Sequence, residues 1–181
     1  MALGAHVRWH PFELHPDTPT EGAPKPFTDE QWPAIRARLI GFAERIGIPI
    51  DPPRRNVNSR LALQIGELVR ERKGDAVMAQ FHHAVSRAFF VDQADIASVA
   101  VIAAQAEPFG VDAASVREVW ESQRFAPAIV DSMRASIAVG VTGVPAFGWH
   151  GDAAVSGMME PEQIERILRA RLGNDGRGQS S

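Results

Sequence analysis

A long run of helix-forming segments, from residue 28 to residue 140, constrains the fold of this chain more than any other feature. Apolar residues in the run recur every three or four positions, which is the spacing of amphipathic helices and not of strands. The first helix is expected to start after a capping-box pair, Thr28 and Gln31, and to end at Gly47. More than half of the chain is therefore predicted to be an all-helical domain.

The remaining helices of this run have clear apolar faces and start signals. Asp95 and Asp112 each precede an apolar periodic segment, and an aspartate in that place is expected to cap a helix N-terminus. The residues that share the inward faces, helix by helix, are Leu61, Ile65, Leu68 and Val69; Val77, Phe81, Val85 and Phe89; Val99, Ile102 and Ala106; Val116, Val119 and Trp120; and Ile129, Met133 and Ile137. These faces predict one packed core.

Short β segments flank the helical run on both sides. Residues 7–14 alternate in polarity until Pro11 shifts the parity, which predicts a kinked strand, and the proline-rich residues 15–27 predict a loop. Residues 141–149 and 153–157 predict a hairpin with its turn at 150–152. A closing helix is expected from Pro161, and a disordered tail over residues 174–181.

Composition narrows the classes of function. Nineteen Lys and Arg face 22 Asp and Glu over 181 residues, a net charge of −3, and no basic patch is present to bind a nucleic acid. No stretch of the sequence is apolar enough for a membrane span or a secretory signal, so we expect a cytoplasmic protein without membrane contact.

Cysteine is absent from the chain, which excludes disulfides, thiolate metal sites and thiol redox chemistry by the chain itself. Among the six histidines, His6 and His10 are four residues apart, but they lie in a segment whose pattern predicts a strand and not a helix, and no acidic ligand pattern accompanies the histidines, so no metal site is expected. No serine stands in the glycine-flanked setting of a nucleophile elbow. The sequence thus predicts no catalytic residues.

Four runs of sequence carry a resemblance to a known family. They are VRWHPFELHPDTPTEG (7–22), NSRLAL (58–63), GVTGVPAF (140–147) and VSGMMEPEQIERIL (155–168). In this order and spacing they resemble the cytoplasmic DsbA-like proteins of the FrnE type, which are related to kappa-class glutathione transferases and 2-hydroxychromene-2-carboxylate isomerases. The resemblance implies an α/β, thioredoxin-like sheet with a large all-helical insertion between its second and third strands.

The resemblance also implies a division of the chain. Residues 1–27 would hold the second strand and a loop, residues 28–140 the helical insertion, and residues 141–173 the proline loop, the hairpin and the last helix. In the family, a first strand, a CxxC motif and a helix precede the segment that corresponds to VRWHPFEL. Two interpretations stay open: Met1 is an internal methionine of a longer protein, which we favour, or the sheet has been rebuilt with a partner chain, as in a homodimer.

The binding site that the resemblance implies is Thr142, Gly143, Val144 and Pro145. Pro145 would be the family's cis-proline, and the main chain of Val144 would pair with an extended peptide or with glutathione. No other cofactor is expected.

Three functions remain open from the sequence. The first is membership of the thiol-disulfide oxidoreductases, without redox activity in this chain. The second is a glutathione-dependent isomerase or transferase, although Met158 and Met159 stand where kappa enzymes place a Ser-Asp pair. The third is a non-enzymatic domain that binds a peptide or a protein partner.

Overall fold

The computed structural model describes residues 6–149 and 154–175, with side chains up to residue 171. Contacts divide the chain into two compact units. The helical unit is formed by Pro11–Met133, and the terminal unit by Met1–His10 with Arg134–Ser181. The predicted limits of the helical insertion, 28 and 140, stay a prediction. The predicted turn at 150–152 and the predicted tail from residue 176 onward lie outside the described residues.

The helical unit begins with one long and well-capped helix. Helix α1 spans Trp32–Arg45. The main-chain N–H of Thr28 donates to Gln31 Oε1 at 3.1 Å, and the Gln31 N–H donates to Thr28 Oγ1 at 3.2 Å, so the predicted capping box is confirmed. Before and after α1, the two short strands β1 (Ala23–Pro24) and β2 (Arg55–Asn56) pair antiparallel within segments predicted to be loops.

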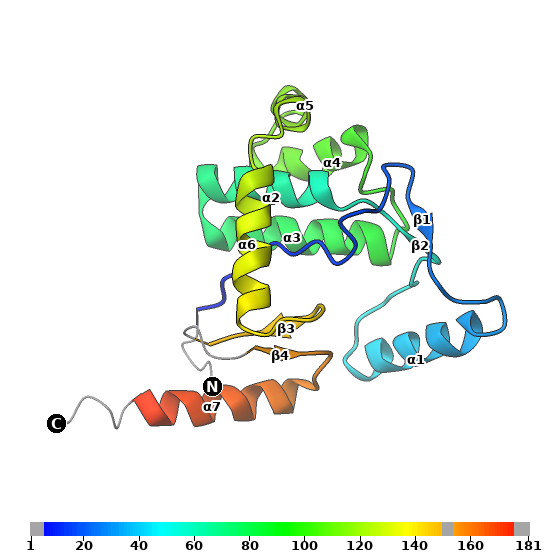
Figure 1. Cartoon of the computed structure of the whole chain (residues 1–181), viewed down its shortest axis with the longest axis vertical. Helices are drawn as coiled ribbons and strands as arrows, with labels where there is room; N and C mark the ends of the chain where they lie inside the picture. Colours follow the sequence, from blue (N-terminus) through cyan, green and yellow to red (C-terminus); the bar gives the residue numbers. More distant parts are fainter. Residues whose placement is uncertain (1–5, 150–153, 176–181) are drawn as a thin grey trace. The chain divides into compact units, whose positions relative to one another are not determined.

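Five more helices and one 3₁₀ turn complete the helical run. They are α2 (Arg60–Lys73), α3 (Asp75–Phe90), α4 (Val99–Ala106), η1 (Glu107–Phe109), α5 (Ala113–Ser122) and α6 (Ala126–Ala138). Figure 1 shows α2 and α3 side by side, with α4 and α5 over them. Asp112 caps α5 through its Oδ1, 2.7 Å from the Ser115 N–H, as predicted. The predicted cap at Asp95 is wrong, because Ser98 is the cap of α4 and Asp95 bonds the Ala97 N–H instead.

The core of the helical unit matches most of the predicted apolar faces. Fully or nearly buried side chains from α2, α3, α4 and α5 form one cluster. Burying a single large apolar side chain in such a cluster contributes about 1.5–3 kcal/mol. Val77, Phe89 and Trp120 pack at the edge of the cluster, whereas Ile137 is 58% exposed, so its predicted burial is wrong. Ile137 lies in the last turn of α6 and in the terminal unit.

The terminal unit contains a short hairpin and one helix. Strands β3 (Ala146–Phe147) and β4 (Val155–Ser156) pair antiparallel, which confirms the predicted hairpin, and α7 spans Pro161–Asp175. The predicted strand over residues 7–14 is wrong: the structure assigns no strand there. A strand exists through hydrogen bonds to a neighbouring strand, and in the part of the chain that is described no strand pairs with these residues. Pro11 also lacks a main-chain donor.

Candidate functional site

The predicted binding residues, Thr142 to Pro145, form the loop between α6 and β3 in the terminal unit. The Val141 N–H donates to Ser136 O at 3.0 Å just after the end of α6. The Thr142 N–H lies 3.5 Å from Ser156 Oγ. The peptide bond between Val144 and Pro145 is cis, as the motif predicts. All four predicted residues are thus brought together by one surface loop.

The pairing of β3 with β4 fixes the direction of the main-chain groups beside this loop. Ala146 pairs with Ser156 and Phe147 with Val155, and the Gly157 N–H donates to Pro145 O at 2.8 Å. In an antiparallel pair, residues alternate between bonding the partner strand and pointing away from it. Pro145 bonds toward β4, so the N–H and C=O of the next residue, Ala146, point to the opposite edge of β3.

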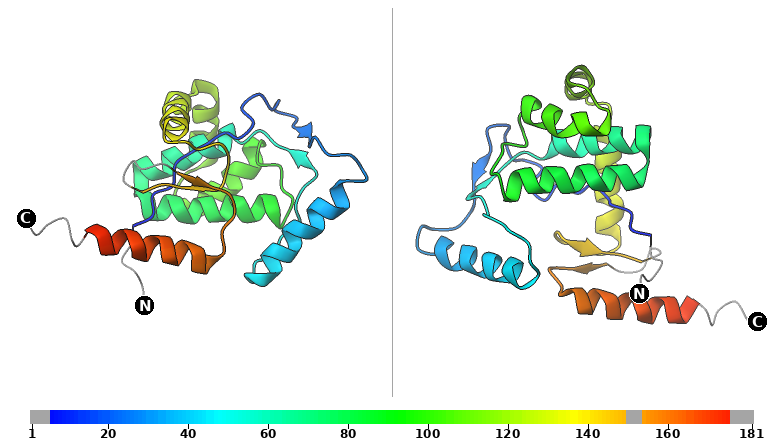
Figure 2. Two further views of the ribbon diagram at one scale, coloured as in Figure 1. Left: turned by 60° about the horizontal axis from the view of Figure 1, so that its bottom comes forward. Right: turned by 180° about the vertical axis from the view of Figure 1, so that it is seen from behind.

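This opposite edge of β3 is unpaired among the described residues, where the sheet consists of β3 and β4 alone. The right-hand view of Figure 2 shows β3 and β4 as two neighbouring arrows. An open strand edge offers a row of donors and acceptors that another extended chain can pair with. The free edge of β3 therefore begins directly after the Thr142–Pro145 loop.

Exposed apolar side chains lie in the loop before β3, on both strands of the hairpin and just after β4. Val144, Val155 and Met158 are each close to half exposed, and Phe147 is more than a third exposed. We call these four residues the hairpin surface. Phe147 and Val155 are direct cross-strand partners, so their side chains lie on one face of the hairpin. An extended segment bound at the free edge would have apolar side chains within reach.

The described side chains provide neither a thiol nor a cluster of metal ligands. The chain has no cysteine. Within residues 6–149 and 154–175, no group of three or more His, Asp or Glu side chains is placed to hold a metal ion. His82 and His83 of α3 have ring centroids 6.1 Å apart. Burial, and then the charge of His83, lowers the pKa of His82, which favours a neutral imidazole in the packed helix.

A buried ionic contact in the helical unit was not predicted. Glu13 is 5% exposed and accepts two bonds from Arg60, from Nε at 3.0 Å and from Nη2 at 3.1 Å. Hydrogen bonding to Glu13 raises the pKa of Arg60, and it outweighs burial, which lowers that pKa. Beside the pair, Asn58 Nδ2 donates to the Thr18 carbonyl at 2.7 Å.

These contacts join two of the sequence runs on which the family resemblance rests. Glu13 and Thr18 belong to VRWHPFELHPDTPTEG, and Asn58 and Arg60 belong to NSRLAL. An acidic residue in the first run and a basic residue in the second could have suggested the contact from the sequence. Its role is structural: a charge-assisted, two-armed bond fixes the entry segment onto the start of α2.

Comparison with known proteins agrees with a thioredoxin-type hairpin and a helical insertion. Residues 2–169 match the DSBA-like thioredoxin domain, and the chain belongs to this family. No curated protein matches the chain. Among the residues described, no helix is both long and apolar enough to cross a membrane.

Solved structures share the fold. A probable DsbA oxidoreductase from Streptomyces coelicolor is similar with a TM-score of 0.78 and 22% identity, over 91% of this chain and 74% of that one. A 2-hydroxychromene-2-carboxylate isomerase is similar with a TM-score of 0.67 and 22% identity, over 84% of this chain and 72% of that one. A candidate protein disulfide isomerase from Nitrosomonas europaea is similar with a TM-score of 0.61 and 18% identity, over 84% of this chain and 79% of that one. At these identities the likeness shows the DsbA-like thioredoxin fold.

Proposed function

We propose that this chain binds an extended peptide at the Thr142–Pro145 loop and the free edge of β3, without thiol redox chemistry of its own. The observation that carries the proposal is the direction of the Ala146 N–H and C=O, which point away from β4 toward an unpaired edge. An extended peptide satisfies such groups by adding a strand, and side chains beside the edge then select among sequences. The exposed apolar hairpin surface favours apolar peptide side chains.

The missing thiol limits the chemistry open to a bound peptide. Disulfide exchange needs a thiolate that attacks a disulfide sulfur, and this chain supplies none. A bound peptide is therefore held and released unchanged. We expect the purified chain to leave the rate of insulin reduction by dithiothreitol unchanged, as measured by turbidity, and a faster rate would contradict the absence of redox chemistry.

The binding step is tested by removing one donor at the free edge. The Ala146→Pro substitution deletes the outward N–H and leaves every β3–β4 bond in place. Ser156→Pro is its matched control, because Ser156 is the cross-strand partner of Ala146 and points its N–H to the other edge of the hairpin. This change also removes the Oγ that lies 3.5 Å from the Thr142 N–H, so Ser156→Ala is measured beside it to give the effect of losing that contact alone. The probe is a ten-residue peptide of alternating Thr and Val with a Lys at each end, blocked at both termini and followed by ¹⁵N chemical shifts.

We expect Ala146→Pro to weaken peptide binding by about tenfold or more, from the lost bond together with the steric block of the proline ring. Ser156→Pro is expected to keep the affinity of the unsubstituted chain. Equal affinities for the two variants, both folded by circular dichroism, would contradict binding at the β3 edge.

Glutathione is the second candidate ligand, since a ligand that carries its own thiol needs no cysteine from the protein. The 2-hydroxychromene-2-carboxylate isomerase with the same fold motivates this candidate. Against it, Met158 presents a thioether where kappa enzymes place polar groups, and a thioether accepts hydrogen bonds only weakly.

A thermal-shift titration separates the two ligands. Binding at one hundred times the dissociation constant stabilises a folded protein by about 2.7 kcal/mol. We expect the peptide to raise the melting temperature and glutathione to leave it unchanged. A shift with glutathione and none with ophthalmate, its thiol-free analogue, would favour glutathione as the ligand.

A further inference from the structure

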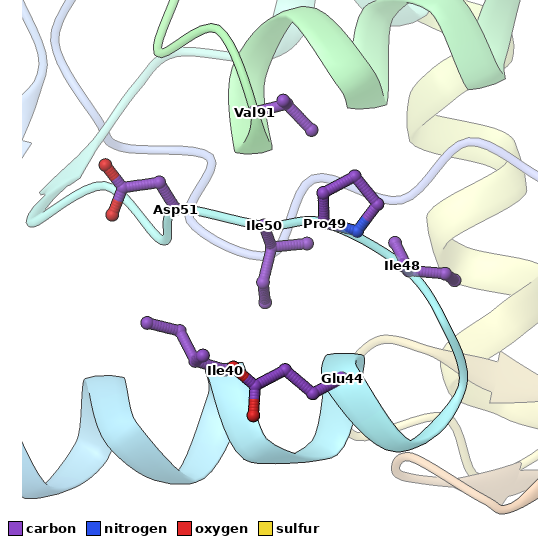
Figure 3. A pocket seen from close by; sticks show the side chains of 7 residues that line it. All are labelled: Ile40, Glu44, Ile48, Pro49, Ile50, Asp51 and Val91. Carbon is purple, nitrogen blue, oxygen red and sulfur yellow. The ribbon is translucent and has the colours of Figure 1, made fainter.

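Residues of the helical unit alone form a cavity of about 420 Å³ that is open to solvent on one side. Its walls are one face of α1, the segment that follows α1, and Val91 just beyond α3 (Figure 3). The lining residues are Ile40, Glu44, Ile48, Pro49, Ile50, Asp51 and Val91. Sites for small ligands usually measure about 300–1,000 Å³ and are mostly apolar with a few polar groups, so size and lining both fit a ligand.

The walls are held in place by Asp51. Its Oδ1 accepts from Arg36 Nη2 at 2.7 Å and from Arg36 Nε at 3.2 Å, which ties it to α1. Its Oδ2 accepts from Gln93, and its N–H donates to Phe90 O at 2.6 Å, which ties it to the end of α3. The Asp51 carboxylate is therefore fully used by the protein, and the cavity is preformed.

The other carboxylate of the lining, Glu44, differs from Asp51. In the part of the chain that the structure describes, the Glu44 carboxylate has no hydrogen-bond or ion-pair partner. No cationic residue lines the cavity. The neighbouring Arg45 donates to Gly41 O and lies over the Phe42 ring, away from the lining.

Glu44 lies in the last turn of α1, which ends at Arg45. The carbonyls of this turn already have donors, because Ala43 O accepts from the N–H groups of Ile46 and Ile48, and Glu44 O accepts from the Gly47 N–H. The negative charge at this end of the cavity is therefore that of the Glu44 carboxylate. Figure 3 shows Glu44 next to Ile40 on α1, across the cavity from Ile50. One uncompensated negative charge thus stands beside an apolar volume.

We propose that this cavity binds a small organic cation with an apolar body, such as an alkyl or aryl ammonium. The apolar part fills the space among Ile40, Ile50 and Val91, and the ammonium lies beside the Glu44 carboxylate. Anionic ligands are disfavoured, because the Glu44 carboxylate is unpaired among the described residues, Arg36 pairs with Asp51, and no cationic residue is among the lining residues. The cavity is formed by residues of the helical unit and the β3 edge by residues of the terminal unit, so the proposal does not depend on peptide binding.

Three probes of one length test the charge preference: hexylammonium, 1-hexanol and hexanoate. Each is titrated into the full chain while the methyl signals of Ile40, Ile50 and Val91 are followed by ¹³C chemical shifts. We expect hexylammonium to bind most tightly and hexanoate most weakly, with shifts at these methyls and none at Val144. Hexanoate or hexanol binding as tightly as hexylammonium would overturn the proposal, as would shifts that miss these methyls.

Two variants with a matched surface control locate the charge. Glu44→Gln keeps the shape and removes the charge, and is expected to weaken hexylammonium binding by about two- to fivefold, the strength of an exposed ion pair, while hexanol binding stays the same. Glu121→Gln, on the exposed side of α5, is expected to change neither. Ile40→Trp, which fills the space, is expected to abolish binding of hexylammonium and hexanol alike. An unchanged hexylammonium affinity in Glu44→Gln contradicts the assignment even if Ile40→Trp fails to fold.

Discussion

The helical unit and the terminal unit differ in how their side chains are buried. Every buried side chain of the described residues belongs to the helical unit, where α2, α3, α4 and α5 surround one apolar cluster. The terminal unit instead exposes the hairpin surface and Ile137. The helical unit also exposes large apolar side chains, such as Ile48 and Phe90, but only in the terminal unit do exposed apolar residues accompany the described free edge of β3. Exposed apolar residues next to a free strand edge are typical of a binding surface.

One polar group from each unit shows a related difference. In the helical unit, the fully buried Gln64 donates from Nε2 to Gln123 Oε1 at 3.0 Å, and its Oε1 accepts from the Phe125 N–H at 3.3 Å. In the terminal unit, the main-chain groups of Ala146 point to an open edge. A buried polar group with all its partners in the protein helps to fix one structure. A main-chain group at an open strand edge can instead bond a ligand. Three pairs of substitutions, one residue from each unit, test this division.

The largest expected effect is in the helical core. Phe81 is buried and meets Phe109 edge-on, with ring centroids 5.8 Å apart. We expect Phe81→Ala to lower the free energy of unfolding by about 3–5 kcal/mol, because the packed surroundings leave a cavity. Phe147→Ala in the terminal unit is expected to cost less than about 1 kcal/mol. Urea unfolding followed by circular dichroism measures both, and equal losses would show that the hairpin surface is buried in solution.

An intermediate effect is expected at the ionic contacts. Arg60→Ala strands the buried Glu13 carboxylate, and we expect a loss of about 2 kcal/mol, below the value for a fully buried pair because Arg60 is 38% exposed. The exposed pair of Arg169 with Glu165 in α7 is the control, and Arg169→Ala is expected to cost about 0.5 kcal/mol or less. If both losses are small under the same urea assay, Glu13 is not buried in solution.

The smallest effect has opposite signs in the two units. Gly66 lies inside α2, where an added Cβ would meet Phe81 at 3.9 Å, an ordinary contact, so Gly66→Ala is expected to stabilise by about 0.5–1 kcal/mol. Gly157, beside the proline loop, has φ +113°, and Gly157→Ala is expected to destabilise by about 1 kcal/mol. Melting temperatures compare the two variants, and destabilisation by Gly66→Ala would mean that α2 has no room for the methyl group.

Sequence reasoning worked where the signal is local. The Thr28 and Gln31 capping box, the Asp112 cap and the apolar faces of α2 to α5 each depend on residues within a few positions of one another. It failed for the strand at 7–14, because pairing decides whether alternating residues form a strand, and pairing is a long-range property. It also placed the cap of α4 at Asp95, whereas Ser98, three residues later, is the cap.

The candidate site was predicted only in part. The motif located the Thr142–Pro145 loop, but the outward direction of Ala146 depends on the register of β3 against β4. The cavity beside Glu44 was not predicted at all, because its walls come from α1, the segment after it and Val91, which approach one another only in the folded chain.

The contact between Glu13 and Arg60 has a consequence for the order of folding. The two residues are 47 positions apart, whereas α2 and α3 are joined directly through Gly74. Closing a long loop costs entropy that local pairing avoids, so we expect α2 and α3 to associate first and the Glu13 segment to dock afterwards. A Glu13→Gln variant should then unfold faster and refold at an unchanged rate in stopped-flow measurements. The contact would in that case determine how long the helical unit stays folded.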